Sequence, residues 1–154
     1  MYTQLNQGPD SSAFAKPHSS WGTRSLSWWI TLLLALGIIF VGVRFIILPE
    51  TGADGFGISF VNSRDDVYGK IKGIRDIFSG LMLLPLLLMR MRTATAWVFT
   101  TTIIVPVTDG LIILATNGIH DIAHLSIHWG TALVMIVTSV LLFRRPQAGL
   151  RPNS

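Results

Sequence analysis

The sequence contains no cysteine and few charged residues. Without cysteine, the chain can form neither a disulfide nor a thiolate metal site, and cysteine usage does not indicate the redox compartment of the protein. Only 13% of the residues are charged, about half the share that is usual in a soluble domain. In so hydrophobic a chain, an excess of basic residues more often sets membrane orientation than it binds nucleic acid. We therefore expect a lipid bilayer, and no nucleic acid, among the partners.

Polar and apolar stretches divide the chain into three parts. Residues 1–27 are polar and rich in Ser, Gly and Pro, which predicts a disordered tail rather than a secretory signal. Residues 28–143 hold four apolar runs, at about 28–48, 70–89, 94–115 and 121–143, and each has about the 20 residues that a membrane-spanning helix needs. Residues 144–154 form a second tail. The predicted fold class is all-α, an integral membrane four-helix bundle without a second domain.

Basic residues are concentrated in the connections on one side of this predicted bundle. The side that holds both tails has the residues Lys16, Arg24, Arg90, Arg92, Arg144, Arg145 and Arg151. The other side has only Arg64, Lys70 and Lys72, accompanied by several acidic residues. The positive-inside rule therefore predicts that both termini are cytosolic, and we expect the membrane to be that of the endoplasmic reticulum.

Each predicted helix carries an ionisable side chain at a similar depth. At about 1.5 Å per residue, Asp76, Asp109 and His128 lie roughly 9–10 Å from the non-cytosolic end of their helices, and Arg44 roughly 6 Å. Such residues normally face the interior of a bundle and pair with one another, so the shared depth predicts one cavity. Arg75 and Asp76 point about 100° apart on a helix, so each is expected to reach another helix or a shared third group.

Two carboxylates and an arginine in an apolar pocket suit acid–base chemistry. One carboxylate would act as a base and the other as an acid, in an order that the sequence leaves open. Epoxide opening needs this combination, because an acid protonates the departing oxygen while a base activates water or an internal hydroxyl. The catalytic candidates are Asp76, Asp109, Arg75 and His128, and the substrate-binding candidates are Arg44, His124 and Trp129.

Structural interpretations of the same residues stay open. Arg75 and the two aspartates would also suit an ion network that only holds the bundle together. Arg44 is near enough to the interface to extend its charged group into it, and His124 would suit a packing residue. Histidines at 120, 124 and 128 share one helical face, but they span two turns and no second histidine cluster follows. We therefore expect no metal and no cofactor.

Three stretches resemble a family of small four-helix membrane proteins that was long described only as a domain of unknown function. They are "KGIRDIFSGLMLL" (residues 72–84), "VPVTDGLIIL" (105–114) and "IHWGTAL" (127–133), and the resemblance covers roughly residues 30–143. Some members belong to fungal polyketide pathways, such as those to citreoviridin and aurovertin, where they are assigned as hydrolases of polyene epoxides. The resemblance places Arg75, Asp76, Asp109 and His128 at the motif positions of the family.

The sequence and this resemblance together lead to one expected function. It is a membrane-bound epoxide hydrolase or cyclase that opens epoxides of a lipophilic polyene polyketide in secondary metabolism. The alternatives are a membrane isomerase or metal-dependent oxygenase, and a non-catalytic bundle that binds lipid or a partner. The expected ligand is a lipophilic epoxide, and a homo-oligomer stays open.

Overall fold

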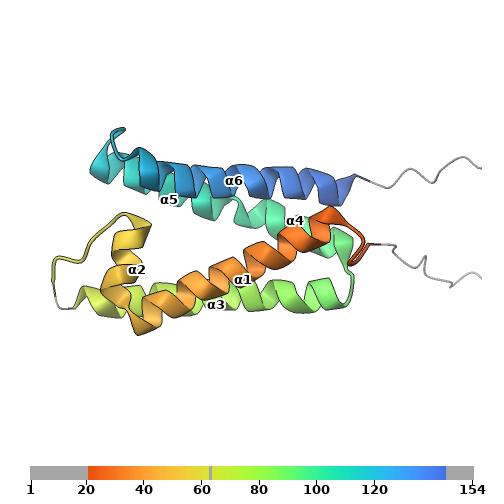
Figure 1. Cartoon of the computed structure of the whole chain (residues 1–154), viewed down its shortest axis with the longest axis horizontal. Helices are drawn as coiled ribbons and strands as arrows, with labels where there is room; N and C mark the ends of the chain where they lie inside the picture. Colours follow the sequence, from red (N-terminus) through yellow and green to blue (C-terminus); the bar gives the residue numbers. More distant parts are fainter. Residues whose placement is uncertain (1–20, 63, 145–154) are drawn as a thin grey trace, which may run out of the picture.

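The computed structural model describes residues 21–62 and 64–144, a range that contains six helices and no strand (Figure 1). They are α1 (Leu26–Ile47), α2 (Pro49–Phe56), α3 (Asp65–Leu88), α4 (Arg92–Thr102), α5 (Ile104–Asn117) and α6 (Ile122–Phe143). The predicted all-α class is confirmed. The predicted count of four helices is wrong, because even with α4 and α5 taken as one element there are five. Most of the two predicted tails lies outside the described residues.

Three elements are long and apolar enough to cross a membrane. They are α1, the stretch formed by α4 and α5 together, and α6, with 22, 26 and 22 residues. These helices are those of a membrane protein. The span predicted at 70–89 is not among them: α3 has 24 residues, but its first half is too strongly charged. Its charged residues are Asp65, Asp66, Lys70, Lys72, Arg75 and Asp76.

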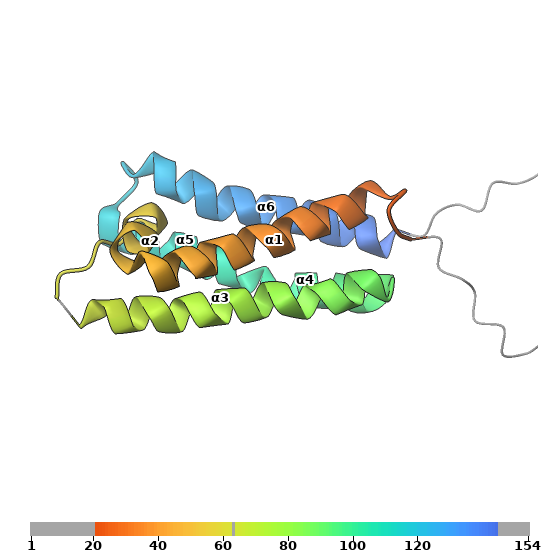
Figure 2. The same ribbon diagram turned by 60° about the horizontal axis from the view of Figure 1, so that its bottom comes forward.

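Two helical hairpins form the two layers of the fold (Figures 1 and 2). One layer is α1 packed along α3, and the other is α4 and α5 packed along α6. The first and last described residues lie at the same end of the bundle. The short helix α2 lies at the opposite end, where it reaches from the first layer toward the second.

Glycines let α1 and α3 approach closely. A methyl group placed on Gly42 of α1 would lie 2.5 Å from the carbonyl oxygen of Gly73 of α3. One on Gly80 of α3 would lie 2.5 Å from the carbonyl oxygen of Ala35. Both distances are too short for real side chains, so only glycine permits this backbone contact, as at other close crossings of membrane helices.

The hydrophobic core joins the two layers near the two chain ends. It consists of the buried residues Trp21, Ala35, Leu83, Leu87, Ala96, Phe99 and Leu142. These belong to the segment before α1 and to α1, α3, α4 and α6. Because the core fills this end of the bundle, space for a site remains toward the end that α2 covers.

The helix α2 lies between the first two apolar runs, where the sequence predicts no helix. Its boundaries follow a known asymmetry of helix ends: Pro49 is the first helical residue and Gly57 follows the last. Gly57 has φ 105°, a left-handed conformation that other residues adopt only with strain. A methyl group there would also lie 2.9 Å from both His124 and Ile113.

Proline divides the third apolar run into α4 and α5. Pro106 has no N–H to donate to the carbonyl of Thr102, and its ring crowds that carbonyl. The helix is accordingly interrupted at Ile103. Asp109 lies less than one turn beyond the proline, so the interruption sets the position of this carboxylate relative to α4.

Candidate functional site

A cavity of about 270 Å³ lies between the two layers, and residues of all six helices line it. Its wall is mostly apolar, but four of the seven expected site residues contribute to it. These are Arg44, Asp76, Asp109 and His128. The structure thus brings together ionisable side chains from α1, α3, α5 and α6, as the shared depth in the sequence suggested.

Asp76 forms an ion pair with a residue of its own helix. The Nζ atom of Lys72, one turn earlier in α3, lies 2.6 Å from Oδ2 of Asp76. The Asp76 side chain is only 13% exposed, so this pair is largely removed from solvent. The expectation that Asp76 would reach another helix, or share a group with Arg75, is therefore wrong. Spacing of four residues brings two side chains onto one helical face, whereas adjacent residues diverge.

Two aromatic rings enclose the ammonium group of Lys72. Its Nζ lies 4.8 Å from the ring centroid of Phe45 in α1 and 4.8 Å from that of Phe56 in α2. A cation at this distance is attracted to the negative face of an aromatic ring. Lys72 is therefore held by contacts from three helices, and it lines the cavity.

Asp109 is partly buried and lines the same cavity from α5. Among the described residues, no hydrogen bond or ion pair reaches its carboxyl group. The two carboxyl groups of the cavity therefore differ in surroundings: Asp76 has an ammonium partner, and Asp109 has no direct polar partner. Different surroundings of this kind allow two carboxyl groups to take opposite roles in proton transfer.

His128 is 8% exposed and its ring is fixed by α2. Its Nε2 atom lies 2.9 Å from the carbonyl oxygen of Phe56, and its ring meets the Phe56 ring edge-on with centroids 4.6 Å apart. A carbonyl oxygen only accepts, so Nε2 donates and carries the proton in the neutral imidazole. Nδ1 is then an acceptor, and no described residue hydrogen-bonds to it. This atom is available to a ligand, a water molecule or a proton.

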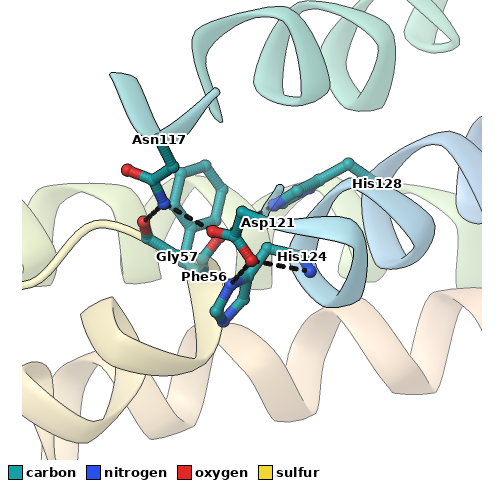
Figure 3. Close-up of polar contacts among 6 residues, drawn as sticks. All are labelled: Phe56, Gly57, Asn117, Asp121, His124 and His128. Atoms are coloured by element: carbon teal, nitrogen blue, oxygen red, sulfur yellow. Dashed lines mark hydrogen bonds and ion pairs between the residues drawn. The ribbon is translucent and has the colours of Figure 1, made fainter. Parts of the chain in front are cut away.

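A polar junction beside the cavity joins α2, α5 and α6 (Figure 3). The side-chain amide of Asn117 donates to the carbonyl oxygen of Gly57 at 2.7 Å and to Asp121 at 2.5 Å. Nδ1 of His124 lies 2.7 Å from the Asp121 carboxylate. The hydrogen bonds from Asn117 and His124 hold the pKa of Asp121 below its ordinary value. His124, expected to bind substrate, is therefore part of this junction and does not line the cavity.

Two other expected site residues lie away from the cavity. Arg75 is exposed and is not among the residues that line the cavity. Trp129 is 41% exposed, and its indole occupies the space over Gly110 where a side chain would otherwise lie. It therefore packs α6 against α5 rather than facing the cavity. Arg44 does line the cavity, with its guanidinium over Gly55 of α2.

The sequence interpretation missed Lys72, although the signal was present. Lys72 and Asp76 stand four residues apart within a segment interpreted as a helix, which is the spacing of a side-chain ion pair. Within the described ranges, no three His, Asp or Glu side chains lie close enough together to hold one metal ion.

The fold and cavity define an all-helical membrane protein with a polar site between two helical hairpins. The chain belongs to the family described as Domain of unknown function (DUF4267), whose sequence pattern matches residues 35–142. This range includes every residue of the cavity except Leu34. Comparison with curated proteins gives no match. Comparison with solved structures gives none either.

Proposed function

We propose that the protein is a membrane-bound epoxide hydrolase or cyclase that acts on a lipophilic substrate by acid–base catalysis. One observation carries the proposal: Asp76 and Asp109, from different hairpins, line one largely apolar cavity in unlike surroundings. The sequence resemblance to membrane proteins of polyketide pathways supports the same reaction. The expected substrate is a polyene polyketide epoxide of secondary metabolism, and no cofactor is needed for this chemistry.

The ion pair favours Asp76 as the base. The Lys72 ammonium stabilises the negative charge of the Asp76 carboxylate and fixes its position, as a general base requires. Asp109 is without an ion-pair partner in the described residues and supplies the proton. Lys72, rather than Arg75, is then the cation that orients a cavity carboxylate.

The reaction then proceeds with protons balanced. The Asp76 carboxylate takes a proton from water, or from a hydroxyl of the substrate, as that oxygen attacks an epoxide carbon. The carbon–oxygen bond of the epoxide breaks, and its oxygen takes the proton of Asp109. Water gives a diol, and an internal hydroxyl gives a cyclic ether alcohol. Nδ1 of His128 carries the proton from Asp76 back to Asp109 and restores the site.

We place the protein in the endoplasmic reticulum membrane with both termini in the cytosol and α3 crossing beside α1. Three facts support this arrangement. Both described chain ends lie at one end of the bundle (Figure 1). The arginines at that end are Arg24, Arg90, Arg92 and Arg144, as the positive-inside rule requires. The helix α3 packs along α1 and is of similar length. The cavity then lies in the lumenal half of the bilayer.

Replacement of each cavity carboxylate tests the proposal. Asp76→Asn and Asp109→Asn keep the size of the side chain but remove proton exchange, and each is expected to lower single-turnover conversion of a polyene epoxide by about 10²–10⁴. The double variant should lower the conversion little more than the worse single variant does, because the two groups act together. Asp66→Asn, at an exposed ion pair of the same helix, is the matched control. The assay uses the full chain in nanodiscs, with thermal stability measured in parallel.

Each alternative function gives a different result in this assay. Near wild-type turnover in both Asn variants would contradict the catalytic roles. Unfolding of both variants would favour a structural ion network. Loss of activity with a chelator, restored by zinc or iron, would favour a metal-dependent oxygenase. A membrane isomerase would convert a polyene without consuming its epoxide.

A further inference from the structure

The polarity of the cavity changes along its length. All its charged residues, together with His128, lie toward the end that α2 covers; they are Arg44, Lys72, Asp76 and Asp109. The residues closest to the hydrophobic core are entirely apolar. They are Leu34, Met82, Leu83, Val98, Phe99 and Met135. Leu83 and Phe99 belong to the core itself, so the packed core closes this end of the cavity.

The hydroxyl groups between these two ends are already used by their own helices. Ser79 donates to the carbonyl of Arg75 at 2.8 Å, Thr102 to that of Val98 at 2.7 Å, and Thr131 to that of Ile127 at 2.7 Å. A serine or threonine bonded in this way does not need a ligand to satisfy its hydrogen. A bound molecule therefore needs no polar group in the middle of the cavity.

The cavity extends along the helices that line it. At a rise of about 1.5 Å per residue, the lining extends roughly 10 Å from His128 to Met135 and roughly 15 Å from Arg44 to Leu34. A cavity of this length can accommodate an extended apolar chain.

We infer that the cavity binds an amphiphile in one direction, with its oxygen-bearing end at Asp76, Asp109 and His128 and its apolar chain toward the core. Leu34, Val98 and Met135 then limit the chain length that the site accepts. This inference deepens the proposed function: it rests on the same cavity and states which end of the substrate reacts. Phe40 of α1 and Ile127 of α6 line the cavity and are also exposed, so the chain enters sideways from lipid between the hairpins.

Binding of primary alcohols of increasing chain length tests this inference without any turnover. Native mass spectrometry of the full chain released from nanodiscs measures how much of each alcohol is bound. Met135→Phe should lower the occupancy of the longest alcohols by about tenfold, since the added bulk fills the apolar end, and should leave the shortest unchanged. Met135→Ala should extend binding to longer chains. Leu133→Phe, an exposed position of the same helix, is the control and should change nothing.

A second measurement determines the direction of the bound chain. An alcohol with a diazirine on its terminal carbon should label residues near Leu34, Val98 or Met135. Labelling of Lys72, Asp76 or Asp109 by the terminal group would overturn the inference. The inference would also be overturned if Met135→Phe lowered the occupancy equally at every chain length. The same holds if Leu133→Phe lowered it as much. If binding follows chain length but epoxides are not opened, the proposed reaction fails while the binding direction stands.

Discussion

Lys72 lies 2.6 Å from Asp76 and connects this carboxylate to three helices at once. The ammonium belongs to α3, but Phe45 of α1 and Phe56 of α2 enclose it. Phe56 in turn accepts a hydrogen bond from His128 of α6 through its carbonyl oxygen. A chain of contacts thus leads from the expected base to the expected proton carrier through α2, whose packing fixes both.

Replacing Lys72 should damage catalysis more than binding. Lys72→Met keeps the length of the side chain but removes the charge that positions Asp76, and a small displacement of a reacting group costs about 10²-fold in rate. We expect this loss in kcat, with KM nearly unchanged, in steady-state kinetics on a polyene epoxide. Lys72→Arg should recover part of the rate because it restores the cation. A loss that Lys72→Arg does not relieve, or that appears only in KM, would contradict a positioning role.

The same helix provides a matched control for this prediction. Lys70 pairs with Asp66 at 2.9 Å with the same four-residue spacing, but the two side chains are 50% and 35% exposed. An exposed pair of this kind contributes about 0.3–0.5 kcal/mol. Lys70→Met should therefore leave kcat, KM and thermal stability close to those of the wild type. A comparable loss of rate from Lys70→Met would show that helix stability, rather than the cavity pair, is being measured.

The contact between α1 and α3 should depend on its glycines. In Gly80→Ala, the new methyl group would meet the carbonyl oxygen of Ala35 at 2.5 Å, so the helices must separate, at a cost of about 1–3 kcal/mol. Gly130→Ala on α6 is the control, because its methyl group has no neighbour within 4 Å. Thermal unfolding in one detergent compares the two variants. Equal stability would contradict the close packing of α1 on α3.

The sequence predicted the depth of the site residues better than their direction. Depth follows from counting residues along a helix, and the structure brings Asp76, Asp109 and His128 to one cavity as that counting suggested. Direction changes by about 100° per residue, so neighbouring charges separate. Arg75 faces outward, while Lys72 reaches Asp76.

The helix α2 shows a second limit of the sequence. Its eight residues are few and weakly apolar, so no long apolar run marks this helix in the sequence. Only Pro49 and Gly57 at its ends indicated a helix. Its position depends on distant contacts, chiefly the hydrogen bonds of its C-terminal end with Asn117 and His128. Such contacts join residues that are far apart in the chain, so no local sequence pattern predicts them.

The orientation in the membrane can be tested with glycosylation sites. An acceptor sequence with a spacer, inserted between Ile58 and Asn62, should be modified because the positive-inside rule places this segment in the lumen. One added after the C-terminal residue should stay unmodified. The measurement is the mass shift of the expressed chain and its reversal by a glycosidase. Modification at the C-terminus alone would reverse the proposed orientation and place the cavity in the cytosolic half.

Acid should loosen the junction of α2, α5 and α6, whose carboxylate, Asp121, lies between the two membrane-spanning segments α4–α5 and α6. The pKa of Asp121 is lowered in the folded protein by hydrogen bonds from Asn117 and His124. The ionised form is therefore favoured by folding, and its contribution to stability is complete above the ordinary pKa of 3.8. This contribution is lost as the pH falls below that value through the folded pKa.

Hydrogen exchange at the amides that close the C-terminal end of α2 is the measurement for this last prediction. In the wild type, exchange at Gly57 and Ile58 should quicken as the pH falls below 3.8, after correction for the intrinsic pH dependence of exchange. In Asp121→Asn, the same two amides should exchange quickly at every pH, since the neutral side chain no longer holds His124. Asp65, whose pKa is lowered by the N–H groups of Asn62 and Val61, titrates in the same range but at the start of α3. If Asp65→Asn removes the pH dependence at Gly57 and Asp121→Asn does not, the effect belongs to the start of α3 and the role given to Asp121 is wrong.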